Sequence, residues 1–366
     1  MKNSIGNNIV LTLFGESHSE AIGAVLDGMP CGISVDIDFI KKRLEARRPH
    51  GNNETGRVES DDFSIISGVF NGFTTGEPIC IIIKNSNVRS QDYEKIRHLA
   101  RPSHADYESH LVHEGFEDYR GGGHYSGRLT APIVALGALC QKMLEDIGIY
   151  VGTHILSCGK VEDKSFDDDV DVLDGEIKSV NSKLMPVIND IEEKIDKEID
   201  VVRQNQDSIG GVIQTAISHM PAGVGEPWFN SVEGALSNAV FSIGGIKGIE
   251  FGAGFRYKEL TGRTGNDELY NDNGVIKTYS NNCGGINGGI SNGMPIVFNC
   301  AVKPTPSISA TQRTIDLDTM ENTTININGR HDPAIIRRIC PVVNSLTCIV
   351  LCDLLKTRFS NSIFTK

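Results

Sequence analysis

The sequence of 366 residues lacks the spacings that mark common metal and redox sites. Its nine cysteines include no CxxC pair and no zinc-type spacing, and no HExxH motif is present. An odd number of cysteines, with no secretory leader evident, is typical of proteins in a reducing compartment. We therefore expect no metal site and a cytoplasmic location.

Long apolar runs and an excess of positive charge are also missing. Charged residues such as Lys84 and Asp353 interrupt the longest apolar stretches, so no membrane span is expected. The net charge of −12 argues against nucleic-acid binding, because affinity for a phosphate backbone needs a basic surface. Any phosphate site must therefore be a local group of cations within an acidic protein.

Familiar nucleotide and hydrolase motifs are absent as well. There is no GxxxxGK[ST] loop, no strand-linked GxGxxG fingerprint and no GxSxG elbow. Glycine, in contrast, is abundant at 39 residues, which suggests many tight turns and close backbone contacts. With 39% hydrophobic residues, the chain can bury one large core or two ordinary ones.

The most informative stretch is a glycine loop that leads into an apolar helix. Gly121–Gly123 lie between Arg120 and Arg128, and a helix is predicted to begin between Ser126 and Pro132. That helix is apolar on nearly all sides, which predicts burial. A flexible loop before a core helix is one interpretation. The flanking arginines favour an anion-binding loop at a helix N-terminus.

A weak internal repeat predicts the architecture. Residues 71–79 resemble residues 288–296, and in each half a loop containing arginine is followed by a proline and an apolar helix, beginning near Pro132 and Pro341. Chance similarity between glycine-proline hairpins is the alternative. We expect an α+β fold with two buried helices, antiparallel or crossed, between two mainly antiparallel sheets related by a pseudo-two-fold axis.

Hydrophobic periodicity and turn residues give the remaining elements. Strands are expected at 8–14, 22–26, 63–70, 78–84, 151–160, 210–220, 246–255 and 293–302, and further helices at 36–48, 188–202, 231–241 and 334–355. The acidic segment 163–174 is expected to be solvated, and the polar segment 260–282 to be a long loop.

Short polar loops carry the candidate chemistry. Taken singly, His18 or His104 could be an ordinary hydrogen-bonded loop histidine, and Arg47 with Arg48 could complement a helix dipole. Together, arginines bind phosphate and carboxylate groups, and histidines move protons near neutrality. The loops are Gly15–Ser19, Ala46–His50, Arg101–Tyr107, Arg120–Arg128, Lys303–Ser307 and Gly329–Pro333.

These loops resemble the chorismate synthase family over essentially the whole chain. The matches begin at Phe14–His18 and end at Gly329–Pro333, with further matches at Arg89–Tyr93, Arg101–Tyr107, Asp118–Gly123, Gly288–Gly293 and Lys303–Ser307. The resemblance implies conversion of 5-enolpyruvylshikimate 3-phosphate to chorismate by anti-1,4-elimination of phosphate with reduced FMN. It also implies the family's β-α-β sandwich, one domain over residues 1–366 and a homotetramer. Whether NADPH reduces the flavin on this chain or through a separate flavin reductase is left open.

The resemblance also implies residue roles. His18 would protonate or hold the reduced flavin, His104 would assist the leaving phosphate, and Asp332 would act with flavin N5 in removing the C6 proton. Substrate anions would be held by Arg47, Arg48, Arg101, Arg128 and Arg330. Flavin contacts would fall on His124, Tyr125, Ser126, Gly244, Gly245, Gly288, Lys303, Pro304, Thr305, Pro306, Ser307 and Arg330.

The chain departs from the family pattern at several positions, including a site near Asn52 and Asn53 where the family often has an arginine. Ser19 and Ser103 stand where the family has glycine, and His124 and Tyr125 stand where it usually has arginine and serine. A titratable imidazole therefore replaces a fixed cation near the expected flavin.

Two functions of other classes are alternatives to the enzyme that the resemblance implies. A flavin- or phosphate-binding paralogue without turnover is disfavoured because His18, His104 and Asp332 are all present. A phosphotransferase without flavin is disfavoured because the sequence has no nucleotide loop and no obvious magnesium carboxylate pair.

Overall fold

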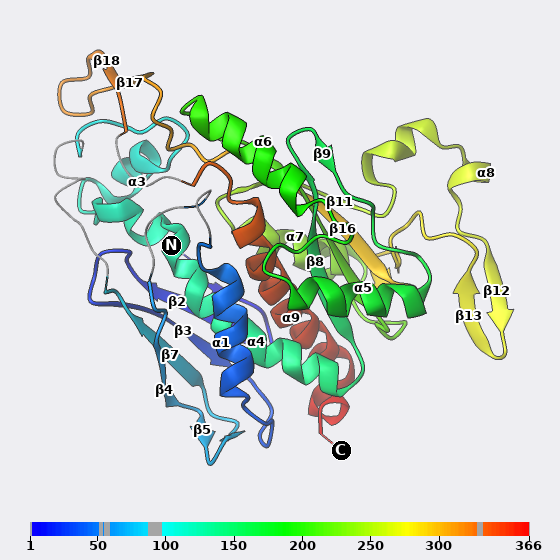
Figure 1. Cartoon of the computed structure of the whole chain (residues 1–366). Coiled ribbons are helices and arrows are strands. Elements are labelled where there is room, and N and C mark those ends of the chain that lie inside the picture. Colours follow the sequence, from blue (N-terminus) through cyan, green and yellow to red (C-terminus); the bar gives the residue numbers. More distant parts are fainter. Residues whose placement is uncertain (1, 51–53, 55–58, 87–96, 328–331, 366) are drawn as a thin grey trace.

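The computed structural model describes residues 2–50, 54, 59–86, 97–327 and 332–365. In this part of the chain, two five-stranded antiparallel sheets enclose a layer of helices (Figure 1). The first sheet contains, in spatial order, β1 (Ser4–Ile5), β2 (Val10–Gly15), β3 (Ala21–Asp27), β7 (Ile79–Lys84) and β4 (Phe63–Ser67). The second contains β11 (Ile246–Phe251), β16 (Ile296–Val302), β10 (Gly211–Ser218), β8 (Tyr150–Cys158) and β9 (Val161–Glu162).

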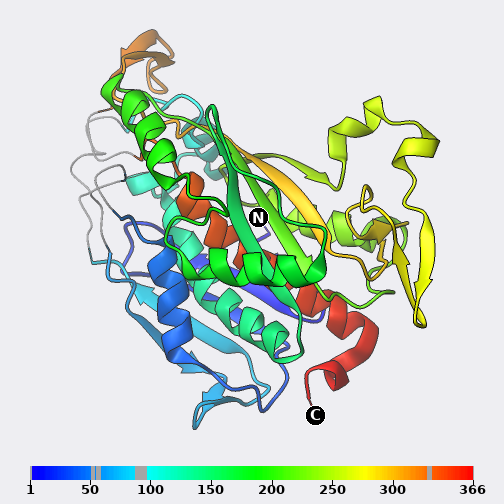
Figure 2. The same ribbon diagram turned by 45° about the vertical axis from the view of Figure 1, so that its right-hand side comes forward.

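Two long apolar helices form the centre of the molecule. In α4 (Thr130–Asp146) every residue from Ala131 to Gln141 is buried, and α9 (Ile336–Phe359) is buried from Ile339 to Leu355. Helix α4 packs on β3 and β7 of the first sheet, whereas α9 packs on β8 and β10 of the second (Figures 1 and 2). A helix that is apolar on all sides needs cover on all sides. The predicted placement of two buried helices between two sheets is confirmed.

The two central helices run in the same direction, so the antiparallel option was wrong. Gly137 of α4 lies against Ser345 of α9, and farther along the Cys140 carbonyl oxygen accepts a weak hydrogen bond from the Cys352 thiol at 3.7 Å. A Cβ atom at Gly137 would come within 2.3 Å of the Ser345 Cβ atom. Glycine at this position therefore allows the two helices to approach closely.

The order of elements shows that the internal repeat is real at the level of topology. In the first half the strands adjoin as β2-β3-β7-β4, and in the second as β8-β10-β16-β11. In the first half, α1 (Ile37–Arg47) precedes the third long strand, β4, and packs on α4. In the second half, α7 (Val232–Val240) precedes the third long strand, β11, and packs on α9. Each half also has a small hairpin before its last long strand, β5 (Val69–Phe70) with β6 (Phe73–Thr74) and β14 (Ile286–Asn287) with β15 (Ile290–Ser291).

One hydrophobic core joins both halves. Buried side chains from both sheets and both central helices form a single continuous cluster, and a smaller cluster lies under α5 (Val170–Ser182). A single domain requires such a core; the assignment of all of residues 1–366 to one domain stays a prediction.

Several elements differ from the sequence-based expectations. The segment 260–282 is not a structureless loop, because it contains α8 (Gly262–Gly265) and the hairpin β12 (Leu269–Asp272) and β13 (Val275–Thr278). The turn of this hairpin is Asn273-Gly274, both with positive φ, which is a strong hairpin signal that the sequence analysis missed. Helix α3 (Asp106–His113) and the hairpin β17 (Gln312–Ile315) with β18 (Asn322–Ile325) were also missed, and α6 (Glu192–Gln204) begins later than predicted.

Short 3₁₀ helices complete the described chain. They are η1 (Arg120–Tyr125), η2 (Gly127–Leu129), η3 (Trp228–Asn230), η4 (Gly254–Glu259) and η5 (Ser360–Ile363).

Helix α9 and its short extension are long and apolar enough to cross a membrane, but 94% of the most apolar window is buried within the fold. The charge that interrupts its sequence has a structural partner. The Asp353 carboxylate accepts backbone hydrogen bonds from Asn7, Asn8 and Ile9 at 2.6–3.0 Å. It thereby fixes the start of the first sheet to the central helix layer.

The acidic segment 163–174 is not uniformly solvated, because the Asp163 side chain is fully buried. Its carboxylate accepts backbone N–H bonds from Ile188 and Asn189 at 2.6 and 3.1 Å and lies 3.7 Å from His154 Nδ1. Burial alone would raise the pKa of Asp163, but the nearby His154 ring and the backbone N–H bonds from Ile188 and Asn189 lower it to about 2. Asp163 therefore holds the segment before α6 against the second sheet as an anion.

We expect Asp163→Asn to lower the free energy of unfolding by about 2 kcal/mol at neutral pH. This is the free energy that corresponds to a pKa lowered by somewhat less than two units on folding. Because the folded-state pKa lies below the unfolded one, the contribution is present above about pH 4 and is lost as pH falls through about 2. Denaturant unfolding at several pH values measures it. Asp171→Asn, an exposed change in the same segment, is the control; equal stability of the two variants at neutral pH would contradict the prediction.

Candidate active site

The predicted site loops gather where both central helices begin. Thr130 at the start of α4 accepts a hydrogen bond from Arg47 Nε at 2.8 Å, and near the start of α9 Arg338 Nε donates to the Arg47 carbonyl oxygen at 3.1 Å. Since α4 and α9 run in the same direction, the partial positive charges of both N-termini point toward this region. The fold therefore adds two helix dipoles to a group of arginines.

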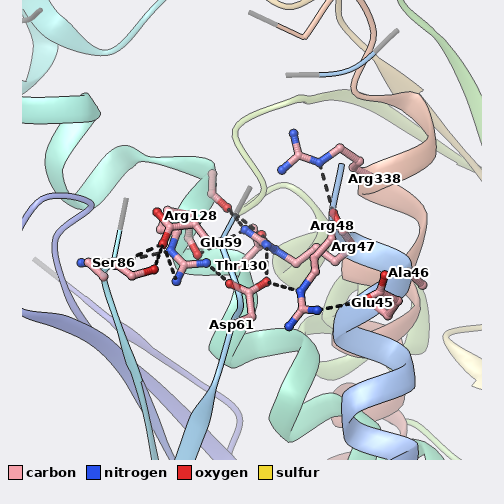
Figure 3. Close-up of polar contacts among 12 residues, drawn as sticks. Glu45, Ala46, Arg47, Arg48, Glu59, Asp61, Ser86, Arg128, Thr130 and Arg338 are labelled. Carbon is pink, nitrogen blue, oxygen red and sulfur yellow. Dashed lines mark hydrogen bonds and ion pairs between the residues drawn. The ribbon is translucent and has the colours of Figure 1, made fainter. Parts of the chain in front are cut away.

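Five charged side chains form what we call the arginine–carboxylate cluster: Arg47, Arg48, Glu59, Asp61 and Arg128 (Figure 3). Asp61 is at its centre, with its carboxylate 3.2 Å from Arg47 Nη1, 3.7 Å from Arg48 Nε and in close contact with Arg128 Nη1. Glu59 lies 3.9 Å from Arg128 Nη2. Three of the five predicted substrate-binding arginines, Arg47, Arg48 and Arg128, are thus brought together, on carboxylates that the sequence pattern did not indicate.

Arg47 is held on every side. Besides Asp61 and Thr130, its Nη2 donates to the Gly127 carbonyl oxygen at 3.3 Å. Burial lowers the pKa of Arg47 to about 9, while Asp61 acts in the opposite direction and the nearby Arg338 and Arg128 lower it further. The group remains a cation at neutral pH and has a fixed orientation.

The glycine loop packs on the loop that carries His18. Gly121, Gly122 and Gly123 have φ values of 61°, 81° and 51°, and the Gly123 carbonyl oxygen accepts a hydrogen bond from Ser17 N at 3.1 Å. A Cβ atom at Gly121 would lie 2.1 Å from the His18 ring. Glycine is therefore required at position 121 to leave room for this imidazole.

We expect Gly121→Ala to displace His18 and to lower turnover at least about a hundredfold, because misplacing a proton-transfer group has roughly the effect of removing it. Gly127→Ala is the matched control, since a Cβ atom there would meet nothing within 4 Å. Steady-state kinetics of both variants, with circular dichroism to verify folding, measures the effect. Turnover in Gly121→Ala equal to that of the control would refute the packing argument.

His124 ties the same two loops together. Its Nδ1 lies 2.8 Å from the Gly15 carbonyl oxygen, and because a carbonyl only accepts, Nδ1 carries the proton. The remaining nitrogen, Nε2, is then the one that can gain a proton and offer charge to a ligand. Tyr125 is 46% exposed, and its ring meets the His113 ring edge-on with 6.2 Å between the ring centroids. Ser126 caps the following turn by accepting from Arg128 N at 3.3 Å.

The loop 101–107 connects the glycine loop to the loop 303–307. Arg101 forms a two-point ion pair with Asp106, with both N–O distances 2.7 Å, and its Nη2 lies near Gly122. His104 Nε2 lies 2.7 Å from Ser307 Oγ. Burial would raise the pKa of Asp106, but the hydrogen bonds and charge of Arg101, together with the charge of His104, lower it. The histidine thus lies between an anionic carboxylate and a hydroxyl.

Position 103, where the family has glycine, has a φ of 59°. Ser103 therefore adopts a left-handed conformation that glycine adopts without strain. Its carbonyl oxygen accepts from Lys303 Nζ at 2.8 Å. Ser19, the other substitution, bonds through Oγ to the carbonyl oxygens of Glu16 and Ala21, both at 2.9 Å, and so closes the His18 loop.

Asp332 is connected to the cluster through the start of α9. Its carboxylate forms an ion pair with Arg338, the residue whose Nε contacts the Arg47 carbonyl oxygen. The neighbouring Arg337 forms a buried ion pair with Glu54 at 2.5 Å and donates to the Ala46 carbonyl oxygen at 2.9 Å. Nothing in the sequence pattern identified these arginines or Glu54.

Other predicted site residues have few described contacts. The Gly289 carbonyl oxygen, next to Gly288, accepts a hydrogen bond from Val232 N at the start of α7, and the Gly245 carbonyl oxygen accepts one from Lys303 N. Gly288 has open space where a Cβ atom would lie. Its predicted flavin contact stays a prediction. Arg330 and the match at 89–93 lie outside the described residues.

A cleft of about 860 Å³ lies beside the cluster, between α1 and β4. It shares Arg48 and Asp61 with the cluster, and its other walls include Lys41, Leu44 and Phe63. None of the described residues that line this cleft is a histidine.

The sequence and the fold of this chain are both similar to those of proteins from one family. The family model for chorismate synthase matches residues 9–355. Chorismate synthase from Dehalococcoides mccartyi is 43% identical, with 97% of this chain and 96% of the relative covered, and that from Methanocaldococcus jannaschii is 42% identical with the same coverage. A crystal structure of a chorismate synthase superposes with a TM-score of 0.74 at 28% identity, covering 96% of this chain and 93% of the other.

Proposed function

Because the chain belongs to the chorismate synthase family, we propose that it forms chorismate from 5-enolpyruvylshikimate 3-phosphate at the site around the arginine–carboxylate cluster. One observation carries this proposal: the loops of His18, His104 and Asp332 come together around Arg47, Arg48 and Arg128 at the start of both buried helices. Such a site offers cations for a substrate with carboxylates and a phosphate, and groups that move protons.

The proposed reaction breaks the C6–H bond and the C3–O bond to phosphate and forms a second double bond in the ring. Phosphate leaves with the electron pair of its C–O bond, and the C6 proton passes to a base. Atoms and electrons balance without net oxidation or reduction. When bound, reduced flavin mononucleotide supplies electron density to the ring transiently.

The described residues fit a flavin phosphate. Burial, together with the nearby charge of Lys247, lowers the pKa of Lys303. Two neighbouring cations favour a bound anion. Gly244 has open space where a Cβ atom would lie, so backbone can approach a ligand there. Lys303, the loop to Ser307 and Gly244–Gly245 would therefore hold this group, with His124 Nε2 as a further contact.

The chain's own residues then have distinct tasks. His104 would donate a proton to an oxygen of the departing phosphate from Nε2, the atom that now contacts Ser307 Oγ at 2.7 Å. Asp332 would accept the C6 proton, with its carboxylate held in position by the ion pair with Arg338. His18 would donate a proton toward the flavin. Arg48 and Arg128 would bind the substrate anions, and Arg47 would hold the helix ends in place.

We also propose that the chain acts in the cytoplasm as a homotetramer, with one domain per chain. Its flavin is reduced either with NADPH on this chain or by a separate flavin reductase. The alternative is a paralogue that binds flavin or phosphate without turnover.

An anaerobic assay with photoreduced FMN tests the proposal. The enzyme produces chorismate and phosphate in equal amounts, and none without flavin. Binding of reduced FMN and of the substrate without product would establish the paralogue instead. Release of phosphate without chorismate would exclude the elimination reaction.

A further inference from the structure

Asp61 occupies an unusual place among the carboxylates of the site. It is 2% exposed, its φ is 51°, and three arginines lie within 4 Å of its carboxylate. The other arginines around the site that the structure describes have their own partners: Arg101 pairs with Asp106, Arg337 with Glu54 and Arg338 with Asp332. Asp61 is the only carboxylate in the described part of the chain that three arginines share.

The three arginines are not engaged equally. Arg47 and Arg128 are 5% and 6% exposed and donate to Asp61 and to neighbouring backbone carbonyl oxygens. Arg48 is different, because its side chain is 26% exposed, its Nη1 donates to Glu45 at 2.7 Å, and its Nε is 3.7 Å from Asp61, too far for a hydrogen bond. Arg48 thus retains donors for a ligand, whereas the other two are largely fixed by the protein.

Removing the charge of Asp61 would leave three cations within a few ångströms and only two nearby carboxylates, Glu45 at 2.7 Å from Arg48 Nη1 and Glu59 at 3.9 Å from Arg128 Nη2. Like charges in a buried site repel strongly, so the guanidinium groups would separate or recruit another anion. Inorganic phosphate, which is also a product of the proposed reaction, is small enough to serve.

We propose that Asp61 is a positioning residue with two effects: it holds Arg47 and Arg128 in fixed orientations, and it keeps free phosphate from occupying the cluster. The inference about turnover rests on the proposed function, whereas the inference about phosphate does not. Asp61 acts through the arginines and need not touch substrate.

Asp61→Asn is a suitable variant because asparagine tolerates positive φ and matches the side chain in shape. Asp61→Glu keeps the charge on a longer arm. Asp62→Asn is the control, since Asp62 is the exposed neighbouring carboxylate. Phosphate binding to the full chain, without flavin or substrate, is measured by titration calorimetry, and folding by thermal unfolding.

We expect Asp61→Asn to bind inorganic phosphate about tenfold more tightly than wild type, the effect expected when one nearby negative charge is lost. In the assay its kcat falls at least about tenfold while KM for the substrate does not rise, because ground-state anion binding is strengthened. Asp61→Glu retains weak phosphate binding, and Asp62→Asn behaves as wild type in both measurements.

Two results would overturn the proposal. One is unchanged phosphate affinity in a folded Asp61→Asn variant; the other is a raised KM with unchanged kcat, which indicates only a loss of structure. If Asp61→Asn does not fold, Asp61→Glu provides the test. An affinity of Asp61→Glu for inorganic phosphate about tenfold higher than that of wild type would then contradict the proposal. If wild type makes no chorismate, the proposed function fails while the phosphate comparison still decides the role of Asp61.

Discussion

We expect His18→Ala and His104→Ala each to lower kcat by about 10²–10⁴, the usual range for loss of a proton-transfer group. Both imidazoles lie in loops beside the cluster, His18 against Gly121 and His104 against Ser307. Neither belongs to the apolar core, so both variants fold. Anaerobic turnover with saturating reduced FMN measures the effect.

His110→Ala is the control for the two histidine variants. His110 lies on α3, its side chain is 44% exposed and it pairs with Glu117, away from the cluster. It keeps wild-type turnover. Near-wild-type kcat in His18→Ala or His104→Ala would reject the role assigned to that residue.

Gly137→Leu destabilises the fold by about 3 kcal/mol or more, at the upper end of the cost of overpacking a core. A Cβ atom at this position would lie 2.7 Å from the Ser345 Cα atom, so the backbone of α9 and not only a side chain has to move. The free energy of unfolding from a denaturant titration measures the loss.

Gly175→Leu is the matched control, because this glycine also lies within a helix but has nothing within 4 Å of a Cβ atom. Leucine there raises the free energy of unfolding by up to about 1 kcal/mol, since it favours the helix more than glycine does. A similar stability change in both variants would show that the contact between α4 and α9 does not depend on Gly137.

The central architecture could be predicted because it follows from burial. Helices α4 and α9 are apolar on all sides, and only a position between two layers satisfies such a sequence. Helix α3 was missed for the opposite reason: Asp106–His113 carries polar residues and only one buried position, Ser109, so no apolar period marks it.

The sequence indicated the cations, the histidines and Asp332 of the candidate site, but not the other carboxylates that pair with them. Short motifs identify residues, but not their partners, because the pairs are distant along the chain. Arg128 meets Asp61 across 67 residues, and Arg337 meets Glu54 across 283. Asp61 has no local pattern, so only the folded chain shows that it neutralises several arginines. The direction of α9 relative to α4 is equally a property of the packing.

The most direct test of the account is a crystal structure of the enzyme with FMN and 5-enolpyruvylshikimate 3-phosphate. We predict the substrate phosphate within hydrogen-bonding distance of His104 and an arginine of the cluster, and its C6 facing Asp332. Substrate bound instead in the cleft between α1 and β4, beside Lys41 and away from both His18 and His104, would contradict the proposed site.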